Sequence, residues 1–426
     1  MRQSNSNPSS LKRFVQSSIL RLFLIPITGV VSLSTAHLIT KFYGVNGYGQ
    51  IAVIISLSSF LSIAELGLGA SVVNHAANAS SIQSEFSSVF HRSFKLIFLA
   101  SSGLILIIIV LSQSNLLARV LNLSKSGIST PALTTALLIL VIGIPCRLGY
   151  YLLMASGRNL LVIVLQTMPA LILLSVTFVG GEFHYSISTL VMLSTLGISV
   201  ANFLSLLLAR NIIPLKIKDN LRKTKLRTSA LPYFLTTTFT IIPLRVTPIF
   251  LNWSSTLREV SLFAAISSFY QPASSVIQAA SPSLWAEFAR KRESNENSKH
   301  FLRQALILSS ILGVLGAIAL FTLGPIMTRQ FINPHLVGSV KLYLVFSVLL
   351  MMGGLTYPIG IFLTSPEGLR FQAVCTGLVA TFFVIIFFSL GSRYGALGAA
   401  TSFLLATVLF QFVPFLTRVV KILNLP

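Results

Sequence analysis

Long, nearly uninterrupted runs of apolar side chains constrain this chain more than any other feature of its sequence. About twelve such runs, most of them close to 20 residues long, follow one another between short polar breaks. A helix of that length crosses the roughly 30 Å hydrocarbon core of a bilayer, because it rises about 1.5 Å per residue. Charged residues make up only 9% of the chain, against about 25% in a typical soluble protein. The sequence therefore predicts an all-α, polytopic membrane protein.

The predicted spans begin and end where the apolar runs do. They cover residues 19–40, 50–73, 94–112, 132–153, 161–180, 188–209, 231–251, 261–284, 304–326, 341–363, 371–390 and 397–417. None of the loops on the predicted outer side exceeds about 20 residues. Since the chain has no separate extramembrane domain in this prediction, its function is expected to reside in the helical bundle.

The distribution of Lys and Arg predicts how the spans are oriented. With the N-terminus inside, 22 of the 31 basic residues lie in or beside inner loops and 7 beside outer loops, while Arg147 and Arg245 lie within spans. Cytoplasmic loops characteristically retain Lys and Arg, so both termini are predicted to be cytoplasmic. The basic residues that retain the inner loops on the cytoplasmic side then account for most of the net charge of +22. Nucleic acid is excluded as a partner, because the basic residues form no solvated face with stacking aromatic side chains.

The longest strongly basic loop, residues 210–227, divides the predicted spans into two sets of six. Six spans bring each half back to the side on which it began, which predicts a parallel repeat about an axis along the membrane normal. GYYLLMASG at 149–157 resembles GIFLTSPEG at 360–368, at an offset of 211 residues. The predicted units are an N-terminal half (1–210), a basic cytoplasmic linker (211–229) and a C-terminal half (230–426).

Polar side chains recur along one face of two predicted spans. In the eighth span they are Ser267, Gln271, Ser274, Gln278 and Ser281, and in the second they are Ser58, Ser62, Glu65 and Gly69. Steps of three and four residues place such side chains on one side of a helix. Because polar groups are costly in hydrocarbon, these faces are expected to meet a wet cavity. The alternative is close helix packing through small residues.

Three arginines are embedded at or within span boundaries: Arg21, Arg147 and Arg245. A charge at the bilayer centre costs about 2.5–3.5 kcal/mol on insertion scales, so each needs a structural or functional reason. Arg245 lies between Pro243 and Pro248, and a broken helix is tolerated only beside protein or a water-filled cavity. For Arg21 and Arg147 the alternative is that the side chain extends to the inner interface.

An embedded set of three arginines favours an anionic substrate, because a guanidinium group binds a diphosphate through paired hydrogen bonds. The predicted substrate-binding residues are Arg21, Arg147, Arg245, Gln271 and Gln278. Glu65 is the embedded acid and the predicted coupling residue, whose protonation would link a proton gradient to the conformational cycle. The alternative for Glu65 is a structural ion pair with one of the arginines.

No set of residues typical of catalysis or of metal binding occurs in the sequence. A Walker A motif, a pair of embedded carboxylates and a Cys/His cluster with metal-ligand spacing are all lacking. Cys146 and Cys375 fall within apolar segments and are expected to be inert core thiols. Trp253 is expected to be an anchor at the membrane interface. These features predict a protein that is not an enzyme and that uses no cofactor.

Four short motifs carry a resemblance to a known family. They are YGVNGYG at 43–49, AELGLG at 64–69, MASGR at 154–158 and RYGALGAA at 393–400. The segment that begins RLFLIPITGVV at residue 21 and runs to residue 74 resembles the start of Wzx-type polysaccharide repeat-unit flippases. These proteins belong to the multidrug/oligosaccharidyl-lipid/polysaccharide (MOP) exporter superfamily.

The resemblance implies two six-helix bundles in a bacterial inner membrane that alternate between inward-facing and outward-facing forms. It implies a polyprenyl-diphosphate-linked oligosaccharide as the cargo, moved from the cytoplasmic to the outer leaflet for surface polysaccharide synthesis. The partners of such a protein are membrane lipid, a polysaccharide polymerase and a chain-length regulator.

Two other functions stay open at this point. A drug or cation antiporter of the same fold should have more acids and aromatic side chains in its cavity. A membrane-embedded polysaccharide polymerase or glycosyltransferase would need a large outer loop or an acidic catalytic loop.

Overall fold

The computed structural model describes most of the 426-residue chain as a bundle of helices. The described residues are 8–61, 68–69, 83–114, 116–123, 127–156, 158–212, 227–278, 284, 288 and 299–423. Every regular element among them is helical, which confirms the predicted all-α fold class.

The N-terminal part of the bundle begins with one long element that contains two helical segments. In α1 (Pro8–Leu61) the segments meet at Gly44, whose φ of 72° and ψ of 176° are not helical. The elements that follow are α3 (Gln83–Gln113), α4 (Leu116–Val120), α5 (Thr130–Gly143), η2 (Pro145–Arg147), α6 (Leu148–Ala155), α7 (Asn159–Glu182), α8 (Ile187–Ala209) and η3 (Arg210–Ile212). Positive φ is strained for any residue with a Cβ atom, which is why glycine occupies position 44.

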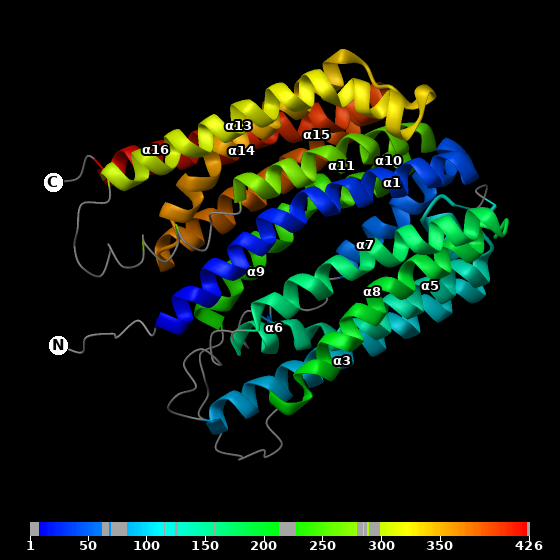
Figure 1. Cartoon of the computed structure of the whole chain (residues 1–426), viewed down its shortest axis with the longest axis horizontal. Coiled ribbons are helices and arrows are strands. Elements are labelled where there is room, and N and C mark those ends of the chain that lie inside the picture. Colours follow the sequence, from blue (N-terminus) through cyan, green and yellow to red (C-terminus); the bar gives the residue numbers. More distant parts are fainter. Residues whose placement is uncertain are drawn as a thin grey trace.

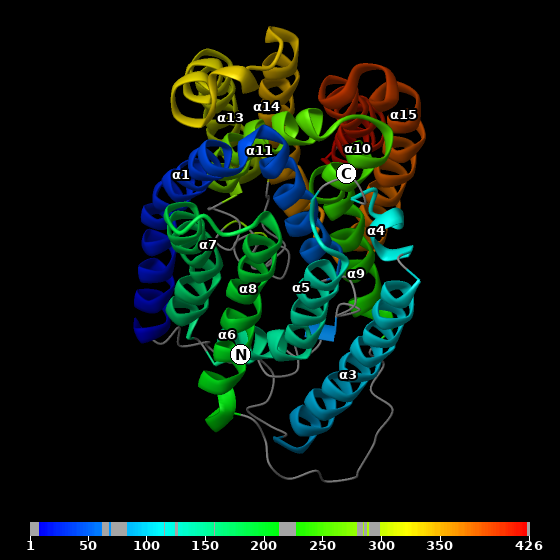
Figure 2. The same ribbon diagram turned by 90° about the vertical axis from the view of Figure 1, so that its right-hand side faces the viewer.

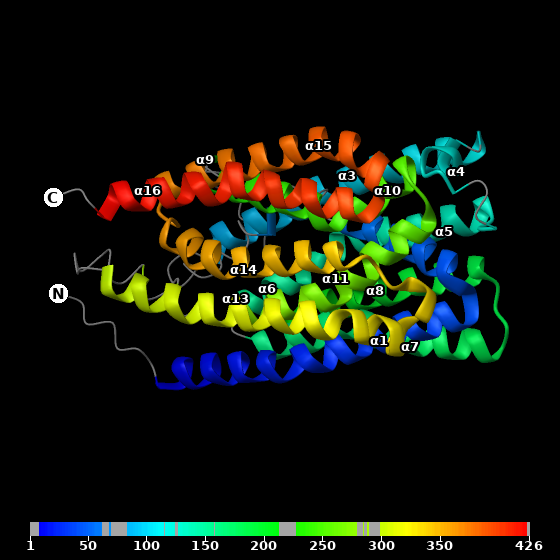
Figure 3. The same ribbon diagram turned by 90° about the horizontal axis from the view of Figure 1, so that it is seen from above.

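The C-terminal part is likewise helical and ends in a second long element with an internal glycine. Its first elements are α9 (Arg227–Ile241), η4 (Ile242–Val246), α10 (Thr247–Ser254), α11 (Leu257–Gln278) and α13 (Lys299–Met327). The rest are η5 (Thr328–Ile332), η6 (Pro334–Leu336), α14 (Val340–Phe362), α15 (Pro366–Thr407), η7 (Val408–Phe412) and α16 (Val413–Leu423). In α15 the two helical segments meet at Gly395, with φ 57°. Figure 3 shows that the chain turns back between α15 and α16.

Ten helical runs in the described residues are long and apolar enough to cross a membrane, so the chain is a multi-pass membrane protein. Two of these runs, Leu24–Ser59 and Glu367–Leu423, contain the turns at Gly44 and Gly395. The run Glu367–Leu423 contains both of the last two predicted spans, whereas Leu24–Ser59 contains most of the first predicted span and the beginning of the second. The count of twelve spans stays a prediction. The first helix begins and the last helix ends at the same end of the bundle (Figure 1), as an even number of crossings requires.

The orientation leads to a labelling prediction. In a background lacking the native thiols (Cys146→Ala, Cys375→Ala), Arg393→Cys should react with an impermeant maleimide added to intact cells. Arg210→Cys should react only after the membrane has been permeabilised, because this arginine begins the basic loop 210–227, which is predicted to be cytoplasmic. Labelling in the opposite order would contradict the orientation. The two variants serve as each other's control, since both replace an exposed arginine.

Contact between the N-terminal and C-terminal helices runs mainly through α1. Among the described residues, α1 packs more extensively against α11 than against any N-terminal helix, and it also contacts η4, α10 and η5. Helices α3, α5, α7 and α8 lie on one side of the molecule and α13, α14 and α15 on the other (Figure 2). The interface between these two groups is thus centred on α1 and α11.

Side-chain hydrogen bonds connect residues 120–122 of the N-terminal half to α10 of the C-terminal half, at the end of the bundle opposite the termini. Asn122 Nδ2 donates to Asn252 O (2.6 Å), and Asn252 Nδ2 donates to Leu121 O (2.6 Å). Trp253 Nε1 donates to Val120 O (2.8 Å), so the predicted interfacial tryptophan also bridges α10 and the last residue of α4. Because Asn252 is only 3% exposed, its amide would be costly to leave unpaired. These bonds connect the N-terminal and C-terminal helices at this end of the bundle.

Candidate functional site

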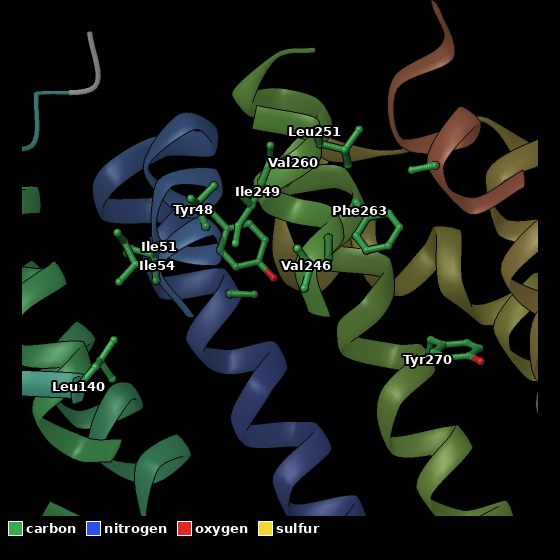
Figure 4. Close-up of a cluster of buried hydrophobic side chains, with 14 of the residues drawn as sticks. Tyr48, Ile51, Ile54, Leu140, Val246, Ile249, Leu251, Val260, Phe263 and Tyr270 are labelled. Carbon is green, nitrogen blue, oxygen red and sulfur yellow. The ribbon is translucent and has the colours of Figure 1, made fainter. Parts of the chain in front are cut away.

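A cavity of about 500 Å³ lies between α1, α7, η4 and α11. It begins beside Ile25 in α1 and extends to Tyr48, just beyond the Gly44 turn. Close to this turn, buried apolar side chains of α1, α10 and α11 face one another, and Tyr48 lies among them (Figure 4). Eleven of the 26 lining residues carry serine, threonine or glutamine side chains, and thirteen are apolar, so the cavity offers both polar and apolar surface.

Arg245 reaches this cavity from a distorted part of the seventh predicted span. Residues Ile242–Val246 form a π-helical turn, and single π turns inside α-helices are often found at functional sites. Pro248 has no backbone N–H for the helix, and the Thr247 hydroxyl donates to Pro243 O (2.6 Å) in this turn. The Arg245 guanidinium is exposed to the cavity, and its Nη2 donates to Gln271 Oε1 of α11 (3.4 Å).

Arg147 lies in a second pocket, of about 270 Å³, within the N-terminal half. It ends the 3₁₀ turn Pro145–Arg147 between α5 and α6, and its side chain is half-buried. Ser205 of α8 donates its hydroxyl hydrogen to Cys146 O (3.1 Å) and so fixes the turn against α8. Tyr150, Tyr151, Gln166 and Asn202 also line this pocket, which gives it one guanidinium, two phenol and two amide groups.

The two pockets adjoin each other, because Ser59 and Gln166 line both of them. Gln166 belongs to α7 and its side chain is exposed to this space. Arg147 from one half and Arg245 from the other therefore line neighbouring parts of one hollow region. No carboxylate lines either pocket among the residues that the structure describes.

The other predicted site residues have different positions. Gln271 lines the cavity and accepts the hydrogen bond from Arg245. Gln278 lines neither pocket; its Nε2 donates to Ser274 Oγ one turn earlier (2.9 Å), and its carbonyl accepts from the Tyr357 hydroxyl (3.4 Å). Glu65 and the side chain of Arg21 lie outside the described residues. The structure thus brings Arg147, Arg245 and Gln271 together and leaves Gln278 apart.

Gln166 and Asn202 line the site but were not predicted from the sequence. Each is an isolated amide within an apolar span, in α7 and α8 respectively. An isolated polar residue inside a membrane span is itself a signal of a polar neighbour. A single amide within an apolar span is therefore a sequence signal that indicates both Gln166 and Asn202.

The chemistry available in the two pockets is the binding of an anion together with hydroxyl-rich groups. The guanidinium groups supply fixed, forked donors for phosphate or carboxylate oxygens. Serine, threonine and amide side chains can donate to and accept from sugar hydroxyls. In the described part of the chain, no group of three or more His, Cys, Asp or Glu side chains could hold a metal ion.

Comparison with solved structures identifies the fold of this chain. The sequence matches no protein-family model and no curated protein. Its structure is similar to that of the lipid II flippase MurJ in an inward closed conformation, with a TM-score of 0.71 and 17% identity over 94% of this chain and 87% of that chain. An inward-facing MATE multidrug resistance transporter of the MOP superfamily matches with a TM-score of 0.68 and 12% identity, over 95% and 98% of the two chains.

A third similar structure is that of the MATE multidrug transporter DinF-BH, solved as a complex with a ligand. Its TM-score is 0.64 and its identity 15%, with 100% of this chain and 99% of that chain covered. At such low identities the similarity establishes the fold, and the Wzx-type resemblance stays a prediction. The chain therefore has the fold of the MOP-superfamily transporters.

Proposed function

We propose that this protein is a flippase that moves a polyprenyl-diphosphate-linked oligosaccharide from the cytoplasmic to the outer leaflet. The observation that carries the proposal is the pair of adjoining pockets with one arginine from each half and no described carboxylate. Low-dielectric surroundings strengthen the attraction between a guanidinium and a diphosphate. Such a site favours an anionic headgroup and disfavours a cation.

The shape of the cavity also suits a lipid-linked glycan. It extends along α1 from Ile25 to Ile39, which is about 20 Å of helix at 1.5 Å per residue. Hydroxyls such as Thr28, Ser32 and Ser275 line it, and these can exchange hydrogen bonds with sugars of different geometry. In our proposal the headgroup enters this space while the polyprenyl tail stays in the surrounding lipid.

Transport would proceed by alternating access. The hydrogen bonds of Asn122, Asn252 and Trp253 close one end of the bundle in the present conformation, and they would break when that end opens. Glu65 is our candidate for the residue that couples this cycle to protons. The delivered cargo would then be available to a polysaccharide polymerase and a chain-length regulator.

A drug antiporter is the second candidate, since MATE multidrug transporters share the fold. An antiporter that binds cations would be expected to have acids in its cavity, and the described lining contains an arginine instead. A polymerase or glycosyltransferase is disfavoured, because the similar structures are those of transporters and flippases.

A comparison of three cargos in vesicles tests the proposal. Purified protein would be reconstituted with a fluorescent polyprenyl-diphosphate glycan, with a neutral ether-linked analogue of the same glycan, or with a cationic rhodamine dye. We expect the diphosphate lipid to cross at least about 10-fold faster than the neutral analogue, because charge-assisted hydrogen bonds contribute about 1.5–3 kcal/mol.

Vesicles without protein supply the background rate for each cargo. Dye uptake driven by a proton gradient, without movement of either lipid, would support the antiporter and contradict the flippase. Equal rates for the charged and neutral lipids would contradict the role given to the diphosphate.

A further inference from the structure

A separate groove of about 400 Å³ lies on the C-terminal half, between α9 and α15. Its lining residues are Leu235 and Phe239 of α9 and Arg370, Ala373, Val374, Gly377 and Leu378 of α15. None of them lines the central cavity or the Arg147 pocket. The groove is apolar apart from Arg370, and it is a different site from the one described above.

The floor of the groove is formed by close packing of the two helices. A Cβ atom on Gly377 would lie 3.1 Å from Cε2 of Phe239, so the glycine lets the phenyl ring approach the α15 backbone. The rim remains open, because Val374 is 62% exposed and Leu378 is 39% exposed. Small residues let membrane helices pack closely, but that packing does not account for a cation at one end of an apolar groove.

Arg370 is placed to hold a negative charge. Its side chain is exposed, and it has no hydrogen bond or ion pair with any residue in the described part of the chain, Glu367 included. Helix α15 begins at Pro366, so the positive end of the helix dipole lies about one turn from this arginine. Arg370 belongs to the predicted inner side, where anionic lipid headgroups attract basic residues.

The dimensions of the groove agree with the depth of one leaflet. Arg370 and Leu378 are eight residues apart on α15, which is about 12 Å along the helix. One leaflet of a roughly 30 Å hydrocarbon core is about 15 Å deep. A lipid whose phosphate lies beside Arg370 would therefore place most of one acyl chain in the groove.

We propose that this α9/α15 groove binds an anionic glycerophospholipid of the inner leaflet, with its phosphate on Arg370 and an acyl chain between Phe239 and Val374. The polyprenyl tail of the cargo is the less suitable occupant, because the groove shares no lining residue with the cavity that would hold its headgroup. The proposal is independent of the cargo and concerns a membrane lipid only.

A lipid bound in this groove would contact α9, the helix that directly precedes the π-helical turn with Arg245. Helix α9 leads directly into the π-helical turn at Ile242–Val246, and the groove lies between α9 and α15. A lipid bound there adds contacts to both helices in the folded protein only. Binding to the folded state alone raises the apparent stability by an amount that depends on lipid concentration.

The test measures lipid binding to the full-length protein in detergent, by native mass spectrometry and by thermal unfolding. The added lipids would be dioleoylphosphatidylglycerol, dioleoylphosphatidylethanolamine or a polyprenyl phosphate. We expect tighter binding and a higher Tm with phosphatidylglycerol than with phosphatidylethanolamine. Arg370→Gln should weaken binding of phosphatidylglycerol by roughly fivefold or more. Arg370→Lys should retain most of it.

Two further variants complete the design. Arg393→Gln is the matched control, because it removes an exposed arginine of the same helix at the opposite end, and it should leave binding unchanged. Val374→Trp should fill the groove from its exposed rim and weaken binding without disturbing the core; its Tm without lipid checks the fold. Equal binding of the two phospholipids, unchanged binding by Arg370→Gln, or Arg370-dependent binding of polyprenyl phosphate alone would overturn the proposal.

Discussion

The double replacement Arg147→Ala with Arg245→Ala is expected to lower the initial rate of transport of a diphosphate-linked glycan by about 100-fold or more. Each arginine supplies charge-assisted hydrogen bonds, which contribute about 1.5–3 kcal/mol, and 1.4 kcal/mol corresponds to a factor of ten. The single variants should therefore each lose about 10- to 100-fold. The measurement is transport into vesicles with the amount of inserted protein held equal.

The two single losses should not simply multiply. Both arginines line pockets that share Ser59 and Gln166, and groups that contact one ligand show coupling in a double-mutant cycle. Lysine at either position should restore only part of the rate, because it keeps the charge and loses the guanidinium fork. Arg393→Ala is the control outside the cavity. Wild-type rates in both single alanine variants would contradict the proposed role of the arginines.

Replacement of Gly49 by valine is expected to abolish most transport by preventing closure at the end opposite the termini. A Cβ atom at this position would lie 2.5 Å from Leu257 O and 2.7 Å from Ser261 Oγ. Ser261 Oγ also donates to Val45 O (2.6 Å) across the same contact between α1 and α11. Since backbone atoms are too close for the side chain to fit, α1 must move away from α11, at a cost of about 1–3 kcal/mol for overpacking.

Two measurements check the result of Gly49→Val. In a background without native cysteines, Ser32→Cys in the cavity should react faster with an impermeant reagent added from outside when Gly49 is replaced. Transport in vesicles should fall at least about 5-fold, since a shift of 1–3 kcal/mol in a two-state equilibrium changes its constant about 5- to 150-fold. Gly103→Val is the matched control, because a Cβ atom there meets nothing within 4 Å. Unchanged labelling and unchanged transport would contradict the gating role of this contact.

The helices could be predicted because a long apolar segment that crosses a bilayer must satisfy its backbone hydrogen bonds internally, and an α-helix does so. The predicted spans 188–209 and 341–363 correspond to α8 (Ile187–Ala209) and α14 (Val340–Phe362) within one residue at each end. Apolar length and the need to satisfy every backbone group inside the membrane fix such elements without reference to their neighbours. The turn at Gly44 was less predictable. Position 44 is one of three glycines in YGVNGYG, and only tertiary packing selects which of them takes a positive φ.

The site residues that could be predicted are those whose residue type is unusual within an apolar membrane span. Arg245 stood out because two prolines flank a charge in an apolar span. The π-helical turn that presents it, however, depends on contacts with α1 and α15 that no local pattern encodes. The Asn122 amide donates to Asn252 O, 130 positions away, and the Asn252 amide donates to Leu121 O, so these bonds follow from the packing of the two halves.

The turns at Gly44 and Gly395 limit how this protein can be engineered. At each of them one non-helical residue connects two helical segments, and its positive φ is strained for any other residue. A reporter or an epitope inserted at either glycine would have to replace that geometry with a loop long enough to rejoin two packed helices. The connection from Asn333 to Ser339, by contrast, leaves α-helical geometry over several residues, so an insertion there would not have to rebuild a one-residue turn between two helices.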